Sequence, residues 1–368
     1  MKKIIIALCV ALVVFAVGYN AYQSEKRATT GKRKVYAVLP LSGPVANVGK
    51  DLKAAMDAWL KVTPQIPFDL IYIDSESQPL KAVTAIQQAT LNEQEPIVIT
   101  ALSPISAAVI PVIAKKNGFS FGINTTDAAK LEQNGRFQLV SSGLAADEKT
   151  LYPYIAKHFT KLAIVYTNEE LGKLSLLQTK EYMQKAGVEV VAEIPLEMNM
   201  PDVRIEALKT IKSGADAVVV YGQATLPYAN FFKELKKFDN HPAILAAIQF
   251  ALPFVQDMLK DLKNDIIFES LDLANMSDEK HIAFNNEMHS QNQPVYLCSA
   301  YAYNVLEVIK YAFDNHLPLT WEAFENLKTF DGLGGKIYFT GKGASEYTSY
   351  LSTFKNGRMI PIKESEEK

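Results

Sequence analysis

From residue 34 onward, short apolar runs alternate with helix-length amphipathic segments. The run AVVVY at 217–221 is typical of a buried strand, and in 50–62 the apolar residues recur at the three- and four-residue spacing of a helix face. Strands that alternate with helices of about 10–15 residues form βαβ units, whose parallel sheets are covered by helices on both faces. The alternation therefore predicts an α/β fold of the doubly wound, Rossmann-like kind.

This alternation occurs in two successive series. The first begins at residue 34, the second begins near Leu151, and a largely helical stretch with further strand-like runs follows. A chain of 368 residues is also long for one hydrophobic core, because single cores stop growing near about 250 residues. We therefore expect two doubly wound lobes. Asn356-Gly357 predicts a hairpin between the last two strands, and the glycine cluster at 332–335 predicts a turn before a strand.

Residues 1–22 form an apolar N-terminal segment that belongs to neither lobe. Two lysines precede an uncharged run at 4–19, which has the length of a secretory signal and is short for a spanning helix. The segment is either a cleaved signal peptide or a retained membrane anchor, and both alternatives send the remainder across the membrane. We expect a flexible leader at 23–33, a charged tail at 363–368 and a periplasmic or extracytoplasmic location.

Composition and motif searches exclude several functional classes. A formal net charge of −2 argues against a nucleic-acid partner, because such proteins neutralise phosphates with excess basic residues. None of the five histidines has metal-ligand spacing, and GxSxG, Walker and GxGxxG motifs do not occur. We expect Cys298 to be a buried small hydrophobe, and Glu169 and Glu170 to stabilise a helix N-terminus. The sequence thus predicts no catalytic residue, no metal, no cofactor and no enzymatic activity.

Uncharged polar residues follow the predicted strands. In open α/β sheets, ligands bind beyond the carboxyl ends of the strands, where loops lead into helices. There the first series places Ser42 after its first strand, Ser103 and Ser106 after its third, and Thr125 and Thr126 after its fourth. Such hydroxyls can cap their own helices, or they can bind a carboxylate together with the free backbone N–H groups of helix starts. As a set that converges on one cleft, they predict a binding site.

Five segments occur in a specific order along the chain. They are LSGPVANVG at 41–49, DSESQPLKA at 74–82, PVYLCSAYAYNV at 294–305, FDGLGGKIYF at 330–339 and KNGR at 355–358. Each segment is a weak signal alone, but their order and spacing over 34–362 together are specific. In this respect the chain resembles the branched-chain amino acid (Leu/Ile/Val) receptors of ABC transporters, which are solute-binding proteins of the type I periplasmic-binding fold.

The resemblance implies an arrangement for the two lobes. Three crossings near 141–143, 270–274 and 339–341 would join them, and a ligand cleft between the lobes would close like a hinge. The resemblance assigns residues 34–141 and 271–338 to lobe 1. It assigns residues 142–270 and 339–362 to lobe 2.

The resemblance also implies ligand-binding residues. In relatives that bind amino acids, the loops matching 103–106 and 124–126 hold the α-carboxylate, while the other lobe supplies a tyrosine, here Tyr221, and an acid for the ammonium group. This chain has Gln249 at the acidic position, and Leu171 where an aromatic residue is common. An unpaired charge in a closed cleft is costly. We therefore predict a ligand other than a plain branched-chain amino acid.

Two hypotheses about function follow. The first is an extracytoplasmic substrate-binding protein of an ABC-type uptake system, a monomer that binds a small amino-acid-like, carboxylate or amide solute by hinge closure and delivers it to a membrane permease. The alternative is a membrane-anchored periplasmic sensor or interaction module that uses the same fold without transport. They differ in whether the N-terminal segment is cleaved and in whether the cleft binds a solute.

Overall fold

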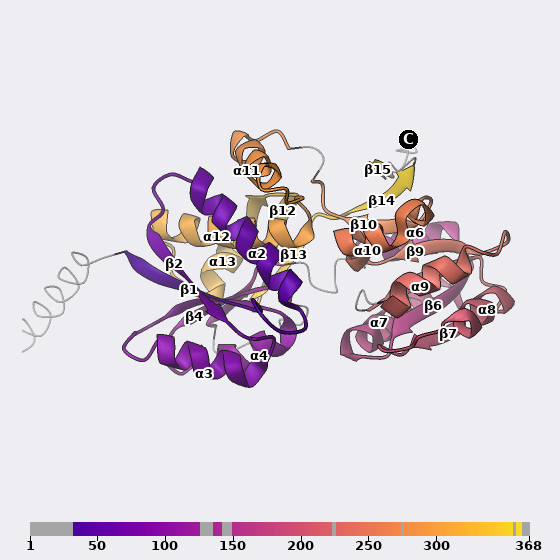
Figure 1. The fold of residues 1–368 in the computed structure, drawn as a ribbon, viewed down its shortest axis with the longest axis horizontal. Helices are drawn as coiled ribbons and strands as arrows, with labels where there is room; N and C mark the ends of the chain where they lie inside the picture. Colours follow the sequence, from indigo (N-terminus) through magenta and orange to yellow (C-terminus); the bar gives the residue numbers. More distant parts are fainter. Residues whose placement is uncertain are drawn as a thin grey trace, which may run out of the picture.

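Two largely parallel sheets organise the part of the chain that the computed structural model describes, namely residues 32–125, 135–141, 149–222, 226–273, 276–355 and 358–362. Figure 1 shows the sheets next to each other, each with its own helices. This is the predicted α/β fold with two doubly wound lobes. The predicted signal or anchor, nearly all of the leader and the charged tail lie outside the described residues. Within those residues, no helix is both long enough and apolar enough to cross a bilayer.

Lobe 1 contains a five-stranded parallel sheet with the order β2-β1-β3-β4-β5. Alternate residues of β1 face opposite sides, so that Val35 and Ala37 pack with α2 and α12, while Tyr36 and Val38 pack with α3 and α4. Both faces are covered, which explains why its central strands are apolar throughout. The elements are β1 (Arg33–Leu39), α2 (Ala46–Val62), β2 (Phe68–Asp74), α3 (Pro79–Ala89), β3 (Ile97–Ala101), α4 (Ser103–Ala114), β4 (Phe119–Ile123), β5 (Phe137–Leu139), α11 (Glu279–Ser290), α12 (Leu297–Asp314) and α13 (Trp321–Leu327).

Lobe 2 contains a seven-stranded sheet with the order β15-β14-β10-β9-β8-β6-β7. In β8, Val218 and Val220 pack with α8, α9 and α10, whereas Val219 and Tyr221 pack with α6 and α7. The elements are α6 (Leu151–His158), β6 (Lys161–Thr167), α7 (Glu170–Ala186), β7 (Glu189–Leu196), α8 (Arg204–Lys212), β8 (Ala217–Tyr221), α9 (Leu226–Leu235), β9 (Ala243–Ala246), α10 (Pro253–Leu259), β10 (Ile267–Ser270), β14 (Tyr350–Lys355) and β15 (Arg358–Pro361), with 3-10 turns η2 (Ile248–Ala251) and η3 (Lys260–Lys263).

The strand pairing contains both of the turns that the sequence predicts near the C-terminus. Strands β14 and β15 are antiparallel with Lys355 opposite Arg358, so the predicted hairpin is confirmed, although 356–357 lie outside the described residues. The glycine cluster forms the turn between β11 (Thr329–Gly332) and β12 (Gly335–Gly341), where Gly332 pairs with Gly335. The cluster is therefore a turn before a strand, as the sequence predicts.

The third crossing lies later in the chain than predicted. Strand β12 continues through 339–341 and pairs with β13 (Ala344–Tyr347), because 341–343 turn with positive φ angles of 94°, 49° and 72°. Phe339 and Tyr347 both belong to the core of lobe 1, and the Ser345 hydroxyl donates to the Ser141 carbonyl at 3.1 Å. The chain thus stays in lobe 1 through residue 347 and crosses at 348–349. The predicted crossing at 339–341, with lobe 2 resuming at 339, is wrong.

Short polar contacts hold the crossings next to one another. The hydroxyls of Ser270 and Ser352 are 2.7 Å apart, and the Thr150 hydroxyl donates to the Glu269 carboxylate at 3.1 Å. Each lobe has its own hydrophobic clusters on both faces of its sheet. Two separately cored lobes joined by chain crossings are the arrangement that permits hinge motion.

The strand order fixes where loops gather. In lobe 1 it reverses between β1 and β3, and in lobe 2 between β6 and β8, and such switch points at the carboxyl edge are where α/β sheets bind ligands. The first crossing leaves the carboxyl end of β5, and the second leaves the carboxyl end of β10. Because the chain leaves each sheet at that edge, both carboxyl edges border the crossings (Figure 1).

Candidate functional site

Ser42 lies at the lobe 1 switch point, in the turn after β1. Its side chain is exposed, and its backbone N–H donates to Asp74 Oδ1 at 3.1 Å. The same oxygen accepts from the N–H groups of Leu41 at 3.0 Å and Glu76 at 2.8 Å. Partial burial opposes ionisation of Asp74, but these hydrogen bonds outweigh it and lower the pKa of the carboxyl group. The carboxylate therefore fixes the turn and presents Ser42 at the edge.

Ser103 and Ser106 follow β3 in the first turn of α4. Ser103 is half-buried, whereas Ser106 is fully buried and its hydroxyl lies 2.9 Å from both Thr100 Oγ1 and Thr125 Oγ1. Thr125, which is 1% exposed, also donates to the Ile123 carbonyl at 3.2 Å. The structure thus brings Ser106 and Thr125 together, but their hydroxyls face each other in the interior. Here they join the start of α4 to the end of β4, and a role in contacting ligand stays a prediction.

Asn124 lies in the loop 124–126 that the resemblance assigns to ligand binding, although it was not among the individual residues predicted. It lies beside Thr125 at the end of β4, and its amide nitrogen donates to Cys298 Sγ at 3.1 Å. Cys298 is buried, and burial raises the pKa of its thiol to about 11. The predicted interpretation of Cys298 as a buried hydrophobe is confirmed, since a thiol of this kind is unreactive at neutral pH. Thr126, the next predicted residue, lies outside the described residues.

At the lobe 2 switch point, Glu169 caps helix α7. Its carboxylate accepts from the N–H of Leu171 at 2.7 Å and of Gly172 at 2.9 Å, and from the Thr167 hydroxyl at 2.8 Å. The predicted capping role is therefore confirmed for Glu169. Leu171, a predicted ligand residue, is half-buried in the first turn of α7, where this cap holds its backbone.

Tyr221 ends β8 on the other side of the same switch point. It is 1% exposed and packs in the cluster formed with α6 and α7. The next residue is Gly222, at a φ of +111°, and a Cβ there would lie 1.7 Å from Thr167 Oγ1. Only glycine allows the ends of β6 and β8 to approach so closely. Gly222 therefore sets the position of Tyr221 relative to the α7 cap.

Gln249 lies in the 3-10 turn η2 that follows β9. Its side chain is half-buried, its Oε1 is buried, and no described residue donates a hydrogen bond to that oxygen. The neighbouring residue Ile248 packs against the core cluster of lobe 1. Gln249 therefore lies where lobe 2 contacts lobe 1, and no acidic residue occupies the turn.

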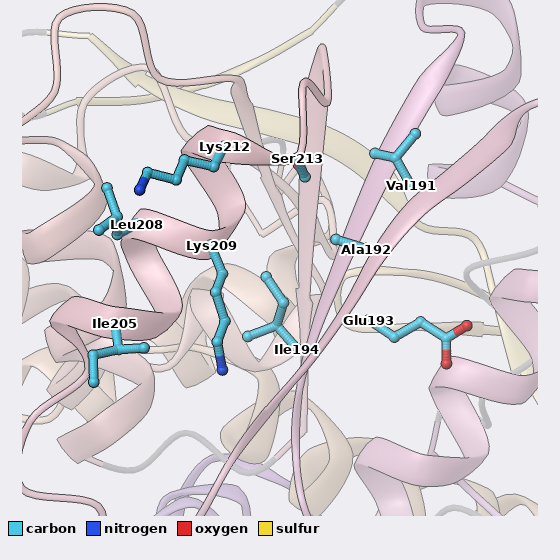
Figure 2. Close-up of a pocket in the computed structure, with 9 residues that line it drawn as sticks. All are labelled: Val191, Ala192, Glu193, Ile194, Ile205, Leu208, Lys209, Lys212 and Ser213. Atoms are coloured by element: carbon cyan, nitrogen blue, oxygen red, sulfur yellow. The ribbon is translucent and has the colours of Figure 1, made fainter.

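A surface hollow of about 460 Å³ lies elsewhere, between edge strand β7 and helix α8. Figure 2 shows Ile194 on the strand beside Ile205, Leu208, Lys209 and Lys212 on the helix, whereas the Glu193 side chain points away from that helix. None of the loops after β1, β3, β4, β8 or β9 contributes to this hollow, and neither does any predicted site residue. Across the described ranges, no cluster of three or more His, Cys, Asp or Glu side chains could hold a metal ion.

The comparisons with known proteins agree with this architecture. The family described as periplasmic binding protein matches residues 34–357. A search of curated proteins returns no match. Among solved structures, an amino acid ABC transporter substrate-binding protein from Pseudomonas fluorescens has a TM-score of 0.78 at 15% identity, with coverage of 90% of this chain and 95% of that one.

Two further similar structures are described as complexes with a ligand. The branched-chain amino acid protein LivJ from Streptococcus pneumoniae, in complex with isoleucine, has a TM-score of 0.75 at 15% identity, covering 90% of this chain and all of that one. A solute-binding protein from R. palustris, in complex with 4-hydroxybenzoate, has a TM-score of 0.72 at 18% identity, covering 90% and 96%. At these identities the structures establish the fold and not the ligand.

The contact at Gly222 generates a prediction with a matched control. Gly222→Ala should destabilise the protein by about 2 kcal/mol or more, because it adds a clash with Thr167 to the strain of a positive φ. Gly214→Ala has a similar positive φ of 71° but nothing within 4 Å of the new Cβ, so it should show only the smaller strain. Urea unfolding of both variants tests this, and equal losses of stability would contradict the proposed close approach.

Proposed function

The chain belongs to the periplasmic binding protein family, and on that premise we propose that it is the extracytoplasmic substrate-binding protein of an ABC-type uptake system. It captures a small solute between its lobes and delivers it to a membrane permease. No step of this function makes or breaks a covalent bond. Affinity comes from hydrogen bonds, apolar contact and the exclusion of water when the lobes close.

The observation that carries the proposal is the position of the two switch points. Both carboxyl edges border the crossings, so the loops carrying Ser42 and Ser103 in one lobe and Tyr221 in the other lead toward the junction. A solute bound at one edge can then contact both lobes only when they close. Because each lobe has its own core, closure needs no change inside either lobe.

The proposed solute is small and either amino-acid-like, a carboxylate or an amide. Ser103 begins α4, and its hydroxyl and the backbone N–H groups of a helix start are groups of the kind that donate to a carboxylate or carbonyl oxygen. Tyr221, which ends β8 and is buried in the cluster with α6 and α7, is the proposed aromatic contact from lobe 2. Gln249 provides a neutral amide where relatives that bind amino acids have an acid, which disfavours a simple ammonium group. One similar structure is a complex with isoleucine and another is a complex with 4-hydroxybenzoate. These two ligands support a proposal that covers several classes of small solute.

A second candidate function is favoured by one contact. Ile248 and Leu252 of lobe 2 pack against the core cluster of lobe 1, so protein side chains already fill part of the junction. A sensor or interaction module that keeps its lobes together would have such a contact. In a transport receptor the same contact forms one wall of the closed site. The two functions differ in whether a solute stabilises the protein.

Ligand screening tests the proposed function directly. Amino acids, small carboxylates and small amides should include at least one compound that raises the melting temperature. A ligand at 100 times its Kd stabilises the folded state by about 2.7 kcal/mol, which corresponds to several degrees. Thermal-shift screening followed by calorimetry measures this. A folded protein that no compound stabilises would favour the sensor or interaction module instead.

Tyr221 supplies a second test once a ligand is found. Tyr221→Leu should weaken binding by about tenfold or more, because aromatic anchors dominate the energetics of small contact surfaces. Tyr152 is the matched control, since it is fully buried in the same cluster but lies on α6. Tyr152→Leu should lower stability without a comparable change in Kd. Calorimetry on both folded variants decides, and an unchanged Kd for Tyr221→Leu would mean that the site is misplaced.

A further inference from the structure

Two buried amide oxygens in the carboxyl-edge loops have no hydrogen-bond donor among the described residues. They are Asn124 Oδ1 in lobe 1 and Gln249 Oε1 in lobe 2. Asn124 directly follows β4, and Gln249 is the third residue after β9, so both belong to carboxyl-edge loops. Buried polar atoms in proteins nearly always have a partner, because an unpaired one loses its water without compensation. Each oxygen is therefore available to accept from a donor outside the described residues.

The residues before and after Gln249 are both held by hydrophobic packing. Ile248 packs against the core cluster of lobe 1. Phe250 is fully buried in lobe 2, with its ring centroid 5.4 Å from Phe232 and 4.9 Å from Phe268. Gln249 thus lies between one neighbour anchored in each lobe. Its amide is held at the lobe boundary by packing.

The orientation of Asn124 is also fixed. Its amide nitrogen donates to Cys298 Sγ, which leaves the oxygen as the free end of the group. Ile123 and Cys298 both belong to the cluster against which Ile248 packs. Neighbours of both amides thus belong to, or pack against, the same hydrophobic cluster of lobe 1.

The described parts of the loops around these oxygens carry no charge. Among described residues, none is charged in 40–45, 102–106, 124–125 or 247–252, which follow β1, β3, β4 and β9. Glu169, after β6, accepts three hydrogen bonds as the cap of α7. A bound ammonium or carboxylate would therefore find no opposite charge among the described residues of these loops. The surroundings favour a neutral molecule with hydrogen-bond donors.

We propose that the solute is a small neutral carboxamide whose NH₂ group donates to Asn124 Oδ1 and Gln249 Oε1 together, an inference that rests on the proposed function. A primary amide has two N–H donors in one plane, which matches two acceptors, and its own carbonyl accepts from donors at the start of α4. A carboxylate has no N–H to donate. An ammonium group has donors, but it brings a charge that the loops do not balance.

Matched compounds test the proposal on the full chain. On the isobutyryl, isovaleryl and benzoyl skeletons, calorimetry compares the carboxamide with the corresponding carboxylate and alkyl- or benzylammonium ion. In at least one skeleton the carboxamide should bind about tenfold or more tightly than both charged analogues. Equal or tighter binding of a charged analogue in every skeleton overturns the inference, and so does failure of all carboxamides to bind. If another compound from the wider screen still binds, the receptor function survives that failure.

One variant in each lobe tests whether Asn124 and Gln249 accept the hydrogen bonds from the carboxamide. Gln249→Met should weaken carboxamide binding about tenfold, and Asn124→Gly, which accommodates the φ of 49° at that position, should do the same. Gln178→Met is the control, because Gln178 Oε1 is also buried and without a donor among the described residues but lies in the middle of α7. Its Kd should stay within about twofold of the unmodified protein. Unchanged affinity in Gln249→Met and Asn124→Gly overturns the assignment.

An acidic residue at position 249 should let the protein bind an ammonium compound more tightly. Gln249→Glu should reverse the preference, with the ammonium analogue binding about tenfold more tightly than it binds the unmodified protein, because the carboxylate offsets its charge. The variant's fold is checked by circular dichroism. If the folded Gln249→Glu variant binds both the carboxamide and the ammonium analogue as the unmodified protein does, residue 249 does not contact the solute and the inference is wrong.

Discussion

Parallel strand pairing is the constraint on which the rest of this structure depends. When every strand runs the same way and a helix returns the chain, all loops between a strand and its following helix must lie at one edge of the sheet. The chain does this twice, with the same order of its first five strands in each lobe. Since the chain also leaves each sheet at that edge, the polar loops and the hinge are placed together by one rule.

The chemistry at these edges is hydrogen bonding with little charge. Charged groups near the loops already have roles: Asp74 fixes the turn at Ser42, and Glu169 caps α7. The hydroxyls of Ser106 and Thr125 are used to join β4 to α4. In the proposed site, the groups that would contact a ligand are the start of α4, the Tyr221 ring and two amide oxygens. Such a surface binds well only when closure removes water, because neutral hydrogen bonds contribute little while solvent competes.

Much of this could be predicted from the sequence, and the failures have physical causes. Apolar runs such as 217–221 predicted buried strands, and Glu169 predicted a cap, because both depend on local pattern. The third crossing was misplaced because a tight turn at 341–343 returns the chain to lobe 1, and only packing of Phe339 and Tyr347 shows this. The sequence also does not show which way a side chain points, so it could not predict the hydrogen bond between Ser106 and Thr125.

Closure of the lobes around a solute is the central claim, and a distance between the lobes tests it most directly. Leu80 on α3 is 83% exposed and Leu177 on α7 is 62% exposed, so each accepts a spin label after substitution by cysteine. Cys298 is buried, and Cys9 is replaced by serine. Pulsed electron paramagnetic resonance should show the label separation shortening and its distribution narrowing when a stabilising solute saturates the protein. An identical distribution with and without that solute would contradict the account.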